Sequence, residues 1–587
     1  MIPSKPLPYP DCWGSADDYV SHLLEFATTS EIFQTLCGGV HILDFFTNEP
    51  GLFQQVVPQD WQEYLLRIDT MRLLDILMRD DLGSLSDAER PPEGLLQYVK
   101  DIRRFSLGRN FAAGEEKPPQ LTRFVSVGMK PKKIHEVSHF ARYVEKFSED
   151  VEDLTGEGIT HFVDFGSGQN YLGRALASDP YNKHIVAVEG REHNIAGAKE
   201  LDMLARFAEK EKVMRNKKLW NQKMIGKKAE DEVDERMLKK MTLAAKASDK
   251  VVDFRPTREL EAIYKPEDGK GNIRYVSGRL ESGDLSDVVT QLETAPDKAN
   301  DLRLMAISIH SCGNLSHHGI RSLIMNPRVR AVAIVGCCYN LMTEKLGPPT
   351  YKHPYMRPSL QALNGRVERE SAKFDPEGFP MSERLSTYND DGVRFNITAR
   401  MMACQAPQNW GKEDSDGFFT RHFYRAVLQK IFLDKGVIQK IYHNEGAEES
   451  NSSSPFNVAT NPVVLGSLSK KCYSSLRSYI RGAVTKLTTH SDYHEQCDVI
   501  KEKMGDMTDE EIAKYEVLYL HRKRELSAIW SLMAFSAGVV ESLIATDRWL
   551  YLKQHSDLVQ DCWVETVFDF RQSPRNLVVV GVKRRDQ

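Results

Sequence analysis

The 587-residue sequence lacks several patterns that would place a protein in a class at once. Its nine cysteines form no C-x-x-C pair, which disfavours a disulfide framework or a zinc ribbon and favours a reducing compartment. The first residues contain no apolar signal-peptide core, and no run approaches about 18 consecutive apolar residues. We therefore expect a cytoplasmic or nuclear protein that has no membrane partner.

The sequence also lacks a strong charge of either sign. Its formal net charge of −5 argues against a protein that coats nucleic acid, although a local basic face is compatible with it. Residues 209–250 form a polar segment in which Lys and Arg outnumber Asp and Glu. We predict that this segment is a charged insertion, which is either simply solvated or helps to hold RNA.

One stretch, residues 161–189, combines the signals of a strand, a turn, a helix and a second strand. Its parts in order are the apolar run 162–165, the glycine turn 166–168, the amphipathic run 171–177, the apolar run 185–188 and a final acid, Glu189. Short apolar runs of this kind are typical of buried parallel strands. The whole order predicts a nucleotide-binding βαβ unit.

The residues around the glycine turn indicate which cofactor this unit binds. A dinucleotide site usually has the spacing G-x-G-x-x-G, but the glycines here fall at 166, 168 and 173. Asp164 precedes the turn, where an anion would repel a pyrophosphate and attract an ammonium group. Glu189 ends the second strand, where a carboxylate can accept hydrogen bonds from both hydroxyls of a ribose. This combination favours S-adenosylmethionine over a nicotinamide dinucleotide, although an ordinary βα turn stays an alternative.

Further strands are predicted at Ile273–Ser277, Leu302–His310 and Arg330–Val335, and a hairpin is predicted from CWVETVFDF and LVVVGVKRR near the C-terminus. We expect an α/β fold, a Rossmann-like class I methyltransferase sheet that is mostly parallel and ends in an antiparallel hairpin. The predicted division of the chain is a helical N-terminal module at 1–120, a methyltransferase core at 121–345, a loop-rich and helical insertion at 346–555, and the hairpin at 556–587.

The ends of the predicted strands supply the candidate site residues, because ligands of open α/β sheets bind at the carboxyl ends of the strands. For the cofactor these are Asp164, Gly166, Ser167, Gly168, Tyr171, Glu189 and His310. For the reaction they are His310, Cys312, Asn314 and Tyr339. His310 is a candidate general base or a structural histidine. Asn314 either orients the methyl acceptor or belongs to a turn, and Tyr339 either lines the acceptor pocket or packs in the fold.

Metal binding is not expected from the sequence. The spacing matches no standard structural zinc site, because adjacent cysteines rarely ligate the same ion; the residues considered are His310, Cys312, His317, His318, Cys337, Cys338 and Cys404. Buried cysteine usually behaves as a small hydrophobe, so we predict a packing role for Cys337 and Cys338.

Several blocks of sequence match a known family. They are KPKKIHEVSHF, VDFGSGQNYLGRAL, HSCGNL, VAIVGCCYNLMTE, FPMS, ARMMACQAPQNW, FYRAVLQ and SPRNLVVVGVK. With these blocks the chain resembles the eukaryotic methyltransferase-like 25 family, which includes the ribosomal RNA adenine dimethylase domain-containing proteins. The resemblance implies a class I methyltransferase domain that uses S-adenosylmethionine.

The paired C-G and C-C turns also look like those of the tRNA 2′-O-methyltransferases that act on the acceptor stem. HSCGNL, however, lacks the proline and the aromatic residue with which adenine dimethylases stack the base. We therefore expect a macromolecular methyl acceptor, with RNA favoured and protein as the alternative. A catalytically inactive scaffold of methyltransferase fold is the non-enzyme alternative, and the sequence predicts no oligomeric state.

Overall fold

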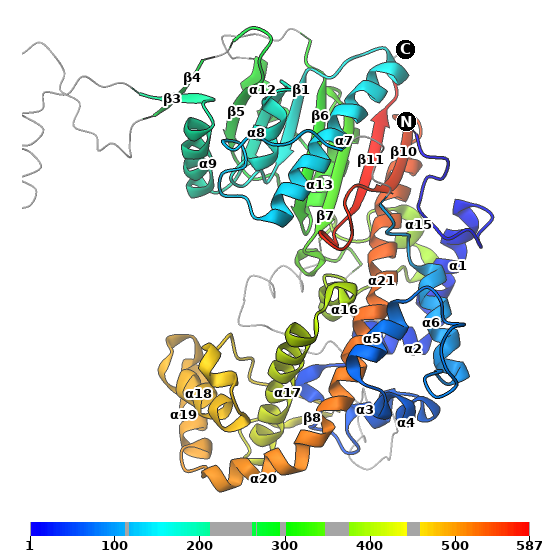
Figure 1. Cartoon of the computed structure of the whole chain (residues 1–587), viewed down its shortest axis with the longest axis vertical. Helices are drawn as coiled ribbons and strands as arrows, with labels where there is room; N and C mark the ends of the chain where they lie inside the picture. The colour runs from blue at the N-terminus through cyan, green and yellow to red at the C-terminus, as the bar shows by residue number, and fades with distance from the viewer. Residues whose placement is uncertain are drawn as a thin grey trace, which may run out of the picture.

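The computed structural model describes residues 2–111, 117–211, 261–265, 267–293, 301–346, 375–442 and 458–585. Most of the predicted charged insertion and parts of the predicted loop-rich and helical insertion at 346–555 lie outside these ranges. Figure 1 shows a sheet flanked by helices at one end of the molecule and a body of helices at the other.

A seven-stranded sheet in the order β10-β11-β7-β6-β1-β2-β5 forms the first of these two parts. Its strands are β1 (His161–Phe165), β2 (His184–Glu189), β5 (Asn272–Ser277), β6 (Leu304–Cys312), β7 (Val329–Cys337), β10 (Val559–Thr566) and β11 (Leu577–Lys583). The first five are parallel, whereas β11 runs antiparallel to both β7 and β10. This topology confirms the predicted α/β fold with its C-terminal hairpin.

Both faces of the sheet are covered, as the continuous apolar strands require. Phe162 joins the core under α7 (Pro131–Thr155) and α8 (Tyr171–Ala177), whereas Val163 and Phe165 join the opposite core with α13 (Leu315–Met325). Two further helices, α9 (Glu192–Leu204) and α12 (Ser286–Glu293), follow β2 and β5. Two short two-stranded sheets pair β3 (Ala208–Lys210) with β4 (Ala262–Tyr264) and β8 (Lys440–Tyr442) with β9 (Val458–Thr460).

The helical body combines segments from both ends of the chain. The N-terminal segment contributes α1 (Ala16–Thr29), α2 (Glu31–Gln34), α3 (Leu52–Val56), α4 (Gln59–Arg67), α5 (Thr70–Met78) and α6 (Glu93–Phe105). The segment between β7 and β10 contributes α15 (Glu383–Ser386), α16 (Ile397–Met402), α17 (Lys412–Asp434), α18 (Leu476–Thr489), α19 (His494–Met504), α20 (Asp509–Tyr519) and α21 (Lys523–Gln554). The four-part division of the chain stays a prediction.

Helix α21 is the axis of this body (Figure 1). Helices α1, α4, α5 and α6 pack against it, and its C-terminal half reaches β10 and β11. Tyr98 on α6, for example, lies 2.6 Å from the hydroxyl of Ser536 on α21. The segment 509–554 is long and apolar enough to cross a membrane, but 94% of its most apolar window is buried inside the protein. Its apolarity is therefore explained by packing on all sides.

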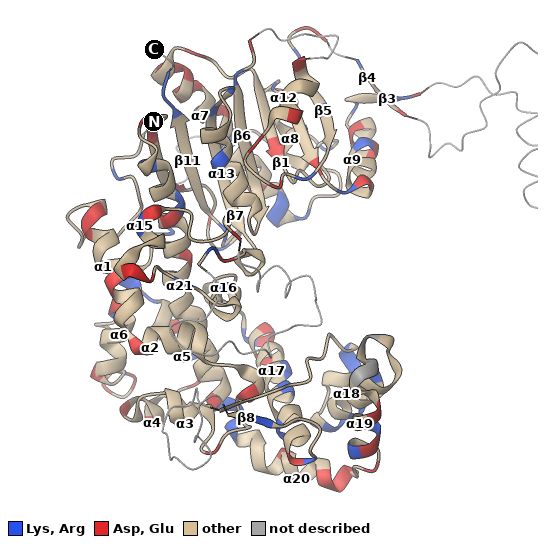
Figure 2. Ribbon diagram, turned by 180° about the vertical axis from the view of Figure 1, so that it is seen from behind, with Lys and Arg blue, Asp and Glu red and all other residues tan. Residues whose placement is uncertain are grey.

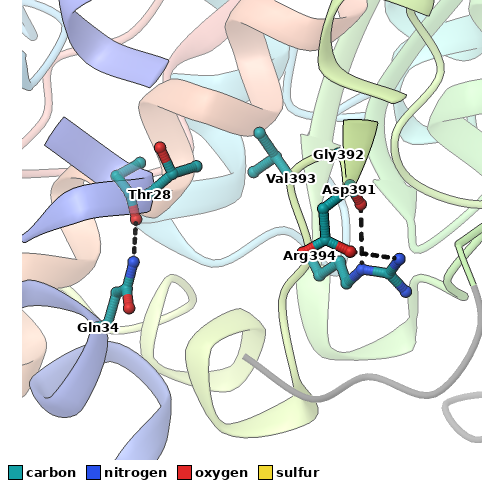
Figure 3. A pocket seen from close by; sticks show the side chains of 7 residues that line it. Thr28, Gln34, Asp391, Gly392, Val393 and Arg394 are labelled. Atoms are coloured by element: carbon teal, nitrogen blue, oxygen red, sulfur yellow. Dashed lines mark hydrogen bonds and ion pairs between the residues drawn. The ribbon is translucent and has the colours of Figure 1, made fainter. Parts of the chain in front are cut away.

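The N-terminal helices also meet the segment that follows α15. Figure 3 shows a small hollow of about 270 Å³ between Thr28 and Gln34 on one side and residues 391–394 on the other. Its polar groups have partners within the fold, because Gln34 donates to the carbonyl of Ala27 at 3.1 Å and Arg394 donates to the Asp391 carboxylate at 3.0 Å. We assign no ligand to this hollow.

Candidate donor and acceptor site

The turn after β1 adopts the left-handed conformations that its residues suit. Gly166 and Gly168 have φ angles of 63° and 57°, which strain any residue with a Cβ. Asn170 stands where a third glycine is common and has a φ of 53°, which asparagine tolerates. The amide N–H of Gly166 donates to the carbonyl of Val188 at 3.0 Å, so the turn is fastened to the end of β2.

Glu189 points toward this turn. One of its carboxylate oxygens accepts the N–H of Gly168 and the other accepts the N–H of Arg191, both at 2.9 Å. The side chain is 8% exposed. The carboxylate is therefore fixed at the edge of the turn, where its remaining acceptor positions are available to a ligand. Its predicted contact with a ribose stays a prediction.

Beside the turn lies a cavity of about 350 Å³. It is lined by Lys133, Val137, Asp164, Gly166, Ser167, Tyr171, Leu172, Ser308, Ile309 and His310. Five of the predicted cofactor residues are among them, and Gly168 and Glu189 lie at the adjoining turn. Tyr171 is held in place by its hydroxyl, which donates to the side chain of Gln169 at 2.7 Å.

Two buried polar groups, Asp164 and Ser167, line this cavity. Asp164 is 4% exposed, and burial raises the pKa of its carboxyl to about 8; the positive charge of Lys133 opposes this shift, and the negative charge of Glu189 adds to it. The buried hydroxyl of Ser167 has no hydrogen-bond partner among the described residues. A buried carboxylate of this kind is stabilised by a cation, and an unused hydroxyl is satisfied by a polar ligand. The cavity therefore fits a polar, cationic molecule such as the amino-acid part of S-adenosylmethionine.

His310 lies on β6 at the rim of the cavity, and its side chain is 37% exposed. Its Nε2 is 3.0 Å from a carboxylate oxygen of Glu136, a fully buried residue of α7. Glu136 also accepts the hydroxyl of Ser573 at 2.8 Å and faces the ammonium of Lys133 at 3.0 Å. Although burial alone would raise it, the contacts with His310, Lys133 and Ser573 hold the pKa of Glu136 well below its ordinary value. A carboxylate thus fixes the orientation of the imidazole.

Glu136 was not among the residues predicted from the sequence. The sequence did contain a signal for this contact. Glu136 ends KPKKIHE and Ser573 begins SPRN, and both segments belong to the blocks that match the family. Only the fold shows that the first turns of α7 and the turn between β10 and β11 meet at His310. Two cations of α7 also face this residue: the ammonium groups of Lys132 and Lys133 lie 3.7 Å and 3.0 Å from carboxylate oxygens of Glu136.

The other predicted catalytic residues have partners inside the fold. The amide of Asn314 donates to Thr343 at 2.5 Å and to Asp375 at 3.2 Å, and its oxygen accepts the N–H of Thr343 at 3.1 Å. Tyr339 is 3% exposed, and its hydroxyl donates to Glu541 on α21 at 2.7 Å. The structure therefore places Tyr339 inside the protein and not on the wall of an open pocket, because its hydroxyl joins the loop after β7 to the helical body.

The cysteines at the ends of β6 and β7 come together. Strand β6 extends beyond the predicted end at His310, because pairing resumes after an irregularity at Ser308–Ser311 and sets Cys312 beside Cys337. The sulfur of Cys312 lies 3.3 Å from that of Cys337, which lies 3.7 Å from that of Cys338. Cys404, which follows α16, lies near them, since its sulfur is 3.5 Å from the side-chain oxygen of Asn340.

Comparison with known proteins agrees with this geometry. Residues 132–345 match the family model of a methyltransferase domain, Methyltransf_32. This range begins at the first turn of α7 and ends in the loop after β7, so it contains the glycine turn, Glu189, His310 and the cysteines. No solved structure matches the chain at a significant level. The fold and these matches together define a protein with a methyltransferase domain.

The chain is, further, similar to two proteins named as methyltransferase-like protein 25. It is 26% identical over 318 residues to the proteins of Homo sapiens and Mus musculus named "Probable methyltransferase-like protein 25". The matched region covers 53% of this chain and 43% and 44% of the two relatives, so the chain spans less than half of their length. These findings confirm the predicted family resemblance. They do not extend to the likeness with tRNA 2′-O-methyltransferases, which stays a prediction.

Proposed function

We propose that this protein transfers a methyl group from S-adenosylmethionine to a macromolecule, with RNA as the favoured acceptor. The observation that carries the proposal is the pair of carboxylates, Asp164 and Glu189, set on the two sides of a glycine turn at a cavity of about 350 Å³. Among the described residues no ion pair neutralises Asp164, so a ligand that brings its own cation would stabilise the ionised form of this buried carboxyl.

In this proposal each residue of the cavity has one task. S-adenosylmethionine, when bound, supplies a sulfonium methyl group that needs no further activation. Asp164 and the hydroxyl of Ser167 bind the amino-acid part, whereas Glu189 accepts hydrogen bonds from the ribose. Positioning then contributes most of the rate, because transfer is an in-line displacement that depends on alignment. His310, oriented by Glu136, takes the proton that a hydroxyl or amine acceptor releases.

A large hollow on the acceptor side supports a macromolecular substrate. It measures about 1680 Å³ and is lined by α5, the segment 109–111, the segment after α16 and the turn between β10 and β11. One contact links it to the site: the imidazole of His135, the neighbour of Glu136, accepts the backbone N–H of Asp569, a lining residue of the hollow, at 3.1 Å. Phe111, Trp410 and Phe570 give this hollow aromatic surfaces, on which unpaired bases stack.

A protein acceptor is the second candidate, and it too has an observation in its favour. The same hollow contains Asp75, Asp80 and Asp569, whose charges favour a basic peptide. Lys and Arg are interspersed with Asp and Glu over the described ribbon, without one face of a single sign (Figure 2). We prefer RNA as the acceptor for two reasons: the turns of this chain resemble those of tRNA methyltransferases, and the hollow has the aromatic surfaces named above.

Two measurements test the proposal in sequence. Isothermal titration calorimetry of the full chain with S-adenosylmethionine should show binding at one site, and an absence of binding would favour the inactive scaffold. Transfer of a labelled methyl group to cell extract should then disappear after RNase treatment and persist after protease treatment. The reverse result would establish the protein acceptor.

A further inference from the structure

The end of the sheet next to the acceptor side brings three cysteine sulfurs to one point. Cys312 ends β6, Cys337 ends β7 and Cys338 follows directly. Their sulfur atoms all lie within 4.8 Å of one another, with the closest pairs at 3.3 Å and 3.7 Å. A tetrahedral zinc ion with Zn–S bonds of about 2.3 Å separates its sulfur ligands by about 3.8 Å. The cluster therefore has the dimensions of a zinc-thiolate site before any metal is added.

The backbone explains how two adjacent cysteines face the same point. Successive side chains of a strand point to opposite faces, so a continued strand would separate Cys337 from Cys338. Cys338 instead has φ 48° and ψ 51°, the left-handed conformation that a residue with a Cβ seldom adopts. Strain of this kind at a non-glycine residue is typical of functional sites. Here it brings the sulfur of Cys338 within 3.7 Å of the sulfur of Cys337.

A fourth cysteine, Cys404, contacts the residue that lies two positions after Cys338. Cys404 follows α16, and its sulfur lies 3.5 Å from the side-chain oxygen of Asn340, two residues after Cys338. The guanidinium of Arg575 donates to the carbonyls of Ala403 and Gln405 at 2.6 Å and 2.9 Å, so the residues on both sides of Cys404 are fixed. Arg575 comes from the turn between β10 and β11 and also places a positive charge near the cluster.

We propose that Cys312, Cys337 and Cys338 bind one Zn²⁺ ion and that Cys404 supplies the fourth ligand. Each thiol releases its proton to solvent as its sulfur coordinates the metal, and no electrons are transferred. Four sulfur ligands close the coordination sphere, which is characteristic of a structural ion and not of a catalytic one. The ion would join the ends of β6 and β7 to α16 and so stabilise the floor of the acceptor side. The proposal does not depend on methyl transfer.

Metal content of the full chain tests the site directly. The chain is purified under reducing, oxygen-free conditions, loaded with Zn²⁺ and desalted, and elemental mass spectrometry should find one zinc per chain. Titration with Co²⁺ should produce the near-ultraviolet band of thiolate-to-cobalt charge transfer and the visible bands of a tetrahedral ion. Cys312→Ser, at an exposed position, should weaken binding at least tenfold, whereas the control Cys12→Ser should bind as the unaltered chain does.

Other results would overturn the proposal. The zinc site is wrong if Co²⁺ gives no charge-transfer band in a chain that circular dichroism shows to be folded. It is also wrong if peptide mapping finds a Cys312–Cys337 disulfide in the cell, or if the chain carries iron with acid-labile sulfide in place of zinc. Cys404→Ser should change the visible cobalt spectrum, and an unchanged spectrum with undiminished affinity would remove Cys404 from the ligand set.

Discussion

The two sides of the site differ in how their polar side chains are used. On the donor side, Asp164 and Ser167 line a cavity, and the hydroxyl of Ser167 has no hydrogen-bond partner in the described part of the chain. On the acceptor side, Asn314 and Tyr339 are bonded to Thr343, Asp375 and Glu541. In the proposed function, the donor site binds a cofactor that is the same for a whole class of enzymes. Its polar side chains are therefore kept available for the ligand and are not used in contacts within the fold. The acceptor side, by contrast, is built mostly from contacts that hold the helical body to the sheet.

The largest effect is expected for Glu189→Ala. Removing two charge-assisted hydrogen bonds to a ribose should weaken S-adenosylmethionine binding about 100-fold, at about 1.5 kcal/mol for each bond. Calorimetry measures this loss, with the exposed neighbour Glu192→Gln as the matched control. If Glu189→Ala bound S-adenosylmethionine with unchanged affinity, Glu189 would not bind the ribose. The contrast between the two sides would then rest on Asp164 and Ser167 alone.

The next effect belongs to the residue that orients His310. Glu136→Gln keeps the shape of the side chain but removes its charge, so methyl transfer should fall about tenfold to 100-fold, less than the loss of about 100-fold to 10,000-fold expected when a general base itself is removed. Affinity for S-adenosylmethionine should stay within about twofold, because Glu136 does not line the cavity. A loss of donor affinity without a loss of turnover would show that Glu136 serves the donor side.

Binding of the donor should depend on pH through Asp164. Because burial raises the pKa of this carboxyl to about 8, the carboxyl is mostly protonated at neutral pH in the free protein. An ammonium group binds only the ionised form, so affinity should rise about tenfold per pH unit between about pH 6 and pH 7. Calorimetry at several pH values measures this slope, which Asp164→Asn should abolish. A flat profile in the unaltered chain would separate Asp164 from the amino group.

The same raised pKa carries a consequence for folding. A carboxyl whose pKa is higher in the folded state binds its proton more tightly there than in the unfolded state. The stability of the fold therefore falls as pH rises from the ordinary pKa of an aspartate to the raised pKa of Asp164, about 8. Added S-adenosylmethionine should reverse this loss, and thermal unfolding with and without it measures the reversal.

The smallest effect is expected for Tyr339→Phe. The substitution removes one buried hydrogen bond to Glu541, which also pairs with Arg575 at 2.7 Å, so unfolding should become easier by only about 1 kcal/mol. Denaturant unfolding measures this change, and donor affinity should not move. A large loss of methyl transfer in a stable Tyr339→Phe protein would return Tyr339 to the catalytic residues.

The donor side could be predicted from the sequence because it is local. One βαβ unit contains the glycine turn, Asp164 and Glu189, and the helix predicted at 171–177 has those bounds in the structure. Strand periods and turn residues act over short separations, so the five parallel strands were placed to within about two residues. Asn170 is compatible with the turn, since asparagine also adopts a left-handed conformation.

The acceptor side could not be predicted in the same way because its contacts are distant in sequence. Glu136 meets Ser573 across 437 residues, and Tyr339 meets Glu541 across 202. The approach of the cysteine sulfurs depends on the strand irregularity near Ser308–Ser311 and on the backbone of Cys338, neither of which has a sequence signal. The packing of the N-terminal helices around α21 could not be predicted for the same reason. An apolar helix face in the sequence does not indicate which distant helix will pack against it.

The most direct test of the central claim compares two ligands of the same cavity. Methylthioadenosine shares the nucleoside and sulfur of S-adenosylmethionine but lacks the amino-acid part and the sulfonium charge. If Asp164 binds the ammonium, the full chain should prefer S-adenosylmethionine at least tenfold in calorimetry, and Asp164→Asn should lose most of that preference. Equal affinity of the unaltered chain for both ligands, or binding of neither, would contradict the claim that this cavity is built for a cationic methyl donor.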